Sequence, residues 1–106
     1  MNIRIKTYIF NKMDLSNEQK AIFSAFKLAG LNNIDTFQNN QTGTRYVKGN
    51  STNNKFLFSH QRNHYVLTCN DDILIATFDP VELRRVINKI MENPNAHMKK
   101  SDKSMF

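Results

Sequence analysis

The chain has 106 residues, 40% of them apolar and 23% charged, and carries a formal net charge of +6. This length suits one ordinary domain, and no apolar run approaches the roughly 20 residues of a membrane helix, so we expect a small cytoplasmic protein without a membrane partner. The single cysteine, Cys69, cannot close an internal disulfide, which agrees with a reducing compartment.

The first expected element is a strand near the N-terminus. The stretch IRIKTYIF, residues 3–10, alternates apolar residues with Arg4, Lys6 and Tyr8, which is the period of two of a half-buried strand. It has neither the apolar core nor the cleavage site of a signal peptide.

A helix is predicted next. Ser16 and Gln19 form the pattern of a capping box, and apolar residues follow at helical spacing as far as Gly30, which supplies a C-terminal stop.

Residues 35–54 predict a loop with one short strand. The strand is expected at TRYVKG, between Gly43 and Gly49, in an asparagine-rich background that favours turns and mobility. The asparagine content also suits an AT-rich genome, either bacterial or phage.

A meander of three antiparallel strands is predicted from Lys55. Its strands are KFLFSH, HYVLTC and ILIATF, and its turns are QRN and NDD. A second helix follows, with Asp79 as its N-cap, Pro80 in its first turn and Glu82 placed for a second capping box, and it ends before Pro94.

These elements predict an α+β fold, in which two helices pack on an antiparallel sheet made of the N-terminal strand, the short strand and the three-strand meander. We expect residues 1–93 to form a single domain. Residues 94–106 lack periodicity and are expected to form a flexible basic tail.

Which face of the sheet each side chain of the meander lies on decides whether an apolar surface is left for a partner. If QRN is a three-residue turn, His60 lies opposite His64, and Phe58 lies opposite Val66. Both faces of the meander are then apolar and both need a cover. Either one helix covers each face, or the long loop wraps over one of them, and no site remains. Alternatively, both helices cover the face of Leu57, Leu67, Ala76 and Phe78 and leave the other face to a partner.

The charge distribution favours nucleic acid as that partner. Residues 1–13 and 36–65 contain basic residues and no acid, whereas residues 66–82 contain four acids and no Lys or Arg. Our first hypothesis is therefore a non-enzymatic protein that contacts DNA or RNA, or a complex containing it, through charge and aromatic stacking. The expected contact residues are Arg4, Lys6, Tyr8, Arg45, Lys48, Lys55, Phe58, His60, Arg62 and His64.

Two other functions remain open. The first is that of an inhibitor or adaptor that binds a host protein, for instance if the protein is phage-encoded and acts in the host cytoplasm. In a variant of this function the partner is a second copy, and the protein forms a homodimer through an apolar face. The expected interface residues are Phe56, Phe58, Val66, Ile73 and Ile75.

The other alternative is a nuclease in which His60 and His64 exchange a proton, with Lys55 or Arg62 nearby. For a metal site the same histidines supply only two ligands, and Cys69 faces the opposite side in this register. We therefore expect no metal and no cofactor.

Overall fold

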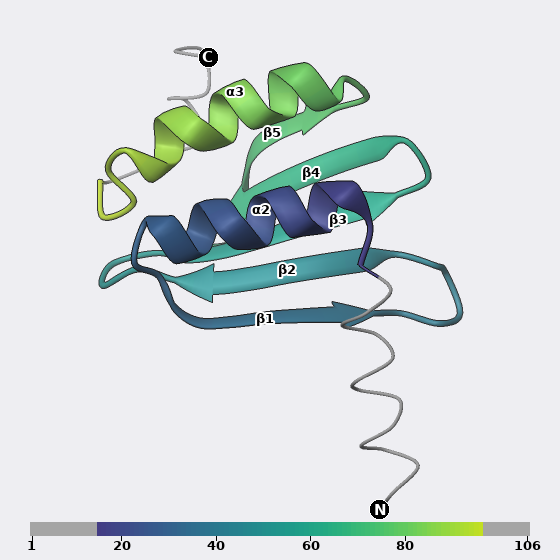
Figure 1. Ribbon diagram of the computed structural model, residues 1–106, viewed down its shortest axis with the longest axis horizontal. Helices are drawn as coiled ribbons and strands as arrows, with labels where there is room; N and C mark the ends of the chain where they lie inside the picture. Colours follow the sequence, from purple (N-terminus) through teal and green to yellow (C-terminus); the bar gives the residue numbers. More distant parts are fainter. Residues whose placement is uncertain (1–14, 97–106) are drawn as a thin grey trace, which may run out of the picture.

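The computed structural model describes residues 15–96, so the expected strand at residues 3–10 lies outside the described part. Along this part of the chain, one helix comes before five strands and a second helix comes after them (Figure 1). The elements are α2 (Asn17–Leu28), β1 (Asn32–Gln38), β2 (Arg45–Asn50), β3 (Lys55–Gln61), β4 (His64–Cys69), β5 (Asp72–Thr77) and α3 (Pro80–Met91). The strands form one antiparallel sheet in the order β1-β2-β3-β4-β5. The predicted α+β class is confirmed.

Both helices lie on the same face of the sheet (Figure 1). Helix α2 packs over β1, β2 and β3, α3 packs along β5, and the helices contact each other. Each helix turns an apolar stripe to the sheet, with Ile22 and Phe26 from α2 and Leu83 and Ile87 from α3 fully buried. One face of the sheet is therefore the core, and the helices leave the other face uncovered.

The N-termini of the two helices are capped differently. At α2 the predicted capping box is present, with the Gln19 amide donating to Ser16 Oγ and the Ser16 amide donating to Gln19 Oε1, both at 3.1 Å. At α3 the Val81 amide donates to the N-cap Asp79 as predicted.

The second capping box, however, does not form at α3. The carboxylate of Glu82 accepts from the Thr77 hydroxyl at 2.7 Å, and that hydroxyl accepts from the Asp79 amide. The Thr77 hydroxyl thus lies between the Glu82 carboxylate and the Asp79 amide, which a capping box would join directly.

Strand β1 was not predicted, because residues 35–54 were expected to be mainly loop. It begins with an irregular pairing in which Asn33 adopts a φ of 56°. Beyond this bulge, Thr36 faces the core and Phe37 faces away from it.

Gly49 allows β2 to pass directly beneath α2. A Cβ at this position would lie 3.0 Å from Phe26 Cδ2 and 3.2 Å from Leu31 Cδ1. Helix and strand therefore approach more closely than any larger residue would permit.

The β3–β4 turn is one residue shorter than predicted, and the expected pairing of His60 with His64 is wrong. The turn consists of Arg62 and Asn63, with Arg62 at a φ of 56°, so Gln61 pairs with His64 and His60 pairs with Tyr65. Because successive side chains alternate, this one-residue change turns every β3 side chain to the opposite face.

The segment that follows α3 is hydrogen-bonded to the β2–β3 turn. Asn54 Nδ2 donates to the carbonyls of Pro94 and Ala96 at 2.7 and 2.8 Å, and Ser51 Oγ donates to Pro94 O at 2.8 Å. The structure describes only residues 94–96 of the expected tail, and these three are held against the domain by such bonds. Neither α2 nor α3 is long and apolar enough to cross a membrane.

Candidate binding face on the open side of the sheet

The side of the sheet that neither helix covers is the candidate site, and we call it the open face. Its side chains alternate with those of the core. They are Asp35 and Phe37 from β1, Tyr46, Lys48 and Asn50 from β2, Lys55, Leu57, Ser59 and Gln61 from β3, His64, Val66 and Thr68 from β4, and Ile73 and Ala76 from β5. Phe78, directly after β5, contacts His64 and extends the same surface.

Large apolar side chains are exposed on this face. Phe37 is 40% exposed, Ile73 41% and Phe78 71%. An exposed apolar surface of this kind on a small protein is a common mark of a binding site.

An aromatic pair lies at the β1 edge of the open face. The rings of Phe37 and Tyr46 stack across the strands, with centroids 4.8 Å apart and planes inclined by 16°. Tyr46 is itself held in place from the other side of the sheet, because Gln19 Nε2 donates to its carbonyl at 3.3 Å.

Two lysines lie on the same face as the aromatic pair, Lys48 next to it and Lys55 further toward the β2–β3 turn. Lys48 follows Tyr46 by two residues on the same face, and Lys55 lies on the neighbouring strand, paired with Asn50. Phe37, Lys48, Lys55 and Leu57 are among the residues that line an open depression of about 540 Å³. An apolar floor and two cations are therefore found together there.

Two carboxylates border the same surface. Asp35 pairs with Lys48 across the strands, and its Oδ1 accepts from the Thr36 amide at 2.9 Å. Asp71, in the β4–β5 turn, lines the depression opposite. An anionic ligand is therefore restricted to the strip around Lys48 and Lys55.

The two histidines lie on opposite faces. His60 is on the core side, with its ring 4.5 Å from that of Tyr65, and its buried Nδ1 has no hydrogen-bond partner among residues 15–96. His64 is on the open face, 4.7 Å from the ring of Phe78. Two imidazoles separated by the sheet cannot act together as acid and base on one substrate.

Cys69 is fully buried on the core side. Burial, and secondarily the nearby Asp72 carboxylate, raise the pKa of its thiol, so this cysteine is a poor nucleophile. Over the part of the chain that the structure describes, no three His, Cys, Asp or Glu side chains gather as metal ligands would.

The structure divides the predicted nucleic-acid residues. Lys48, Lys55 and His64 lie on the open face, and Arg62 lies in the turn at its end. Arg45, Phe58 and His60 lie on the core side, and Phe58 has no exposed surface to stack on a base. Arg4, Lys6 and Tyr8 lie outside the described residues.

The predicted protein-interface residues are divided in the same way. Val66 and Ile73 are on the open face as expected. Phe56 and Phe58 are buried in the core, and Ile75 packs against it, so for these three the expected facing is wrong.

Four large apolar side chains of the open face were missed. Tyr46 alternates with Val47 in the predicted short strand, and this pattern could have identified it. Leu57 and Phe78 were assigned to the covered face, and Phe37 belongs to the strand that was not predicted.

Comparison with known proteins gave no match to a family model, a curated protein or a solved structure. The open face is therefore interpreted from its own chemistry.

Proposed function

We propose that the protein is a non-catalytic cytoplasmic binder of single-stranded nucleic acid, and that the open face is its contact surface. The observation that carries this proposal is that the Phe37–Tyr46 stack, Lys48 and Lys55 share one sheet face that neither α2 nor α3 covers.

The aromatic pair suits bases that are not paired. Proteins that bind single strands stack successive bases on exposed aromatic rings, and they hold the backbone with basic side chains. A base in a duplex offers no free face to Phe37, which sits on a broad sheet and not on a protruding helix. The geometry therefore favours a single strand over a double helix.

The cations are few, which sets the expected strength of the electrostatic contribution. Residues 15–96 contain nine Lys and Arg against seven Asp and Glu, and only Lys48 and Lys55 flank the depression. For single strands the slope of log affinity against log salt is about −0.7 per phosphate contact, so these two lysines should contribute about −1.4 to the slope.

The decisive experiment measures this slope by fluorescence anisotropy, using a labelled single-stranded oligonucleotide of mixed sequence. The test variant is Lys48→Gln with Lys55→Gln. The matched control is Lys20→Gln with Lys27→Gln, two exposed positions on α2 that change the net charge equally.

We expect the open-face variant to bind more weakly, and its slope of log affinity against log salt to be shallower by about 1.4. The control variant should keep most of the wild-type affinity and slope. Equal losses in the two variants would show only a general attraction of a basic protein for a polyanion, and would remove the open face as the site.

A protein-binding adaptor is the second candidate, and the exposure of Phe78 and Val81 favours it. These side chains are 71% and 72% exposed at the junction of β5 and α3. If a second copy binds there, light scattering should detect a dimer that Phe78→Asp dissociates. A monomer at all concentrations would exclude this homodimer.

A further inference from the structure

We infer that the end of the open face nearest the β2–β3 turn recognises the edge of one base, with a preference for adenine. This inference rests on the proposed function and adds base selectivity to it. It starts from a concentration of asparagine side chains at that end of the sheet.

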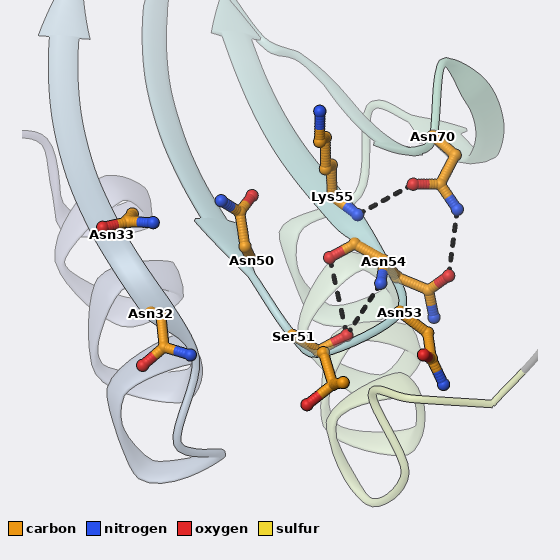
Figure 2. Close-up of a pocket in the computed structure, with 9 residues that line it drawn as sticks. Asn32, Asn33, Asn50, Ser51, Asn53, Asn54, Lys55 and Asn70 are labelled. Atoms are coloured by element: carbon orange, nitrogen blue, oxygen red, sulfur yellow. Dashed lines mark hydrogen bonds between the residues drawn. The ribbon is translucent and has the colours of Figure 1, made fainter.

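The β2–β3 turn borders a second cavity of about 360 Å³ (Figure 2). The described residues of its lining are all polar and include no carboxylate. The lining residues are Asn32, Asn33, Asn50, Ser51, Thr52, Asn53, Asn54, Lys55 and Asn70.

Three of these asparagines are occupied with holding the fold. Asn54 bonds the end of α3, Asn53 bonds Asn95, and Asn70 accepts from the Lys55 amide at 2.8 Å and donates to Asn54 Oδ1 at 2.9 Å. Figure 2 shows the bonds from the Lys55 amide to Asn70 and from Asn70 to Asn54 as a connected chain.

The side-chain amides of Asn32, Asn33 and Asn50 make no hydrogen bond within residues 15–96, and in Figure 2 no bond joins them to the other residues drawn. Of these three, Asn33 and Asn50 also line the depression beside Lys48. Asn33 is positioned by the bulge that opens β1, where its φ is 56°. Bulges commonly redirect a side chain toward a binding site. Asn50 is the last residue of β2 and is paired with Lys55.

The amide-lined cavity is continuous with the depression beside the aromatic pair. Asn33, Asn50, Lys55 and Asn70 line both. Asn50 lies four positions after Tyr46 along β2, which is about 13 Å at the usual rise of a strand. A nucleic-acid strand that stacks one base on Phe37 and runs past Lys48 would therefore bring a following nucleotide to the side-chain amides of Asn33 and Asn50.

A free asparagine amide offers a donor and an acceptor side by side. Adenine offers the complementary pair, and Asn with adenine is the characteristic two-bond contact, whereas guanine is read by Arg or Lys. Among residues 15–96 no arginine lines either cavity, and Lys55 is placed to bind phosphate. The free amides therefore favour adenine.

The test compares oligonucleotides of about ten nucleotides, within the usual site size of a single-strand binder. Oligo(A), oligo(U) and oligo(C), a guanine-containing oligo(U), and the matching deoxy series are titrated by anisotropy into three proteins. These are the wild type, Asn33→Ala with Asn50→Ala, and the control Asn88→Ala, an exposed asparagine on α3.

We expect oligo(A) to bind the wild type and the control about fivefold more tightly than oligo(U) or oligo(C). The double variant should lose this preference and keep its affinity for oligo(U). A preference retained by the double variant, or a preference for guanine, would overturn the inference.

The outcomes also separate this inference from the proposed function. Equal binding of all sequences, still weakened by the Lys48 and Lys55 substitutions, would reject base selectivity and leave the binding face intact. Absence of binding to every oligonucleotide would reject both. Agreement between the ribo and deoxy series would show that the 2′-hydroxyl is not read.

Discussion

Phe37 and Tyr46 stack across β1 and β2 on the face of the sheet that faces away from both helices. Phe37 contributes nothing to the helix-side core, and so its ring is available for a partner. Tyr46 supports it from the neighbouring strand. The two residues thus form the aromatic part of the proposed site.

Replacing Phe37 with Ala should weaken single-strand binding by about five- to tenfold, since stacking on an aromatic ring contributes about 1–3 kcal/mol per base and this ring is partly covered by Tyr46. Leu28→Ala is the control, because Leu28 is an apolar residue exposed on α2. Anisotropy measures the affinities, and thermal melting checks that both variants are folded. An unchanged affinity in Phe37→Ala would exclude stacking on this pair.

Gly49→Ala should lower the free energy of unfolding by about 1–3 kcal/mol. The added methyl would press on Phe26, which is fully buried and packs against Phe56 with ring centroids 6.1 Å apart. Gly43→Ala is informative beside it, because the position has no neighbouring atom within 4 Å and only its φ of 76° is unfavourable. Urea unfolding measures both, and a Gly49→Ala protein as stable as the wild type would contradict the close approach of α2 and β2.

Asn54→Ala should destabilise the protein by about 1–3 kcal/mol, because the buried Asn54 side chain is lost and the partly buried carbonyls of Pro94 and Ala96 and the amide of Asn70 lose their partner. Asn88→Ala, at an exposed position on α3, should change stability by less than about 0.5 kcal/mol. Hydrogen exchange adds a local test, since faster exchange should concentrate at the end of α3 and in the two adjacent turns. Uniform acceleration would argue against a local fastening.

Stability should fall as the pH rises above about 8.5, the ordinary pKa of a thiol. Burial raises the pKa of the Cys69 thiol, so the unfolded chain loses this proton before the folded protein does, and folding weakens until the folded pKa is passed. Burial, followed by the charge of Glu18, raises the pKa of Tyr65 and acts in the same direction at higher pH.

Urea unfolding between pH 7 and 10 checks this, with Cys69→Ala as the comparison. The variant should be less stable at neutral pH, because it leaves a cavity, but its stability should decline less steeply with pH. If the free energy of unfolding declines equally steeply with pH in the wild type and in Cys69→Ala, the thiol does not contribute to the pH dependence.

The helices could be predicted from the sequence because their signals are local. Ser16 and Gln19 bond each other across one turn, and Asp79 caps the next amides, whatever the rest of the fold does. The meander could also be predicted, because apolar runs and turn residues alternate along it.

The facing of the strands could not be predicted, because it depends on single residues. A turn of two residues in place of three moved Phe58 from the expected open face into the core. A bulge in β5, where Ile73 and Ile75 pair with consecutive β4 residues, placed Ala76 and Phe78 on the face opposite to the expected one. Each such change reverses the facing of one strand relative to its neighbour.

Strand β1 has the weakest sequence signal of the sheet. Its inward residues, Ile34 and Thr36, are followed by asparagines and preceded by two more, and the strand is stabilised mainly by its pairing with β2 and by α2. Phe37 could therefore not be recognised as a site residue from the sequence, although Lys48 and Lys55 could.

The most direct test of the open face is a titration of isotopically labelled protein with a single-stranded oligonucleotide, followed by NMR through the backbone amide of each residue. We predict that the shifts concentrate at Phe37, Tyr46, Lys48, Lys55 and Leu57, with little change in the outward residues of α2 and α3. Shifts centred instead on the outer face of α3, around Arg84 and Lys89, would contradict the proposal.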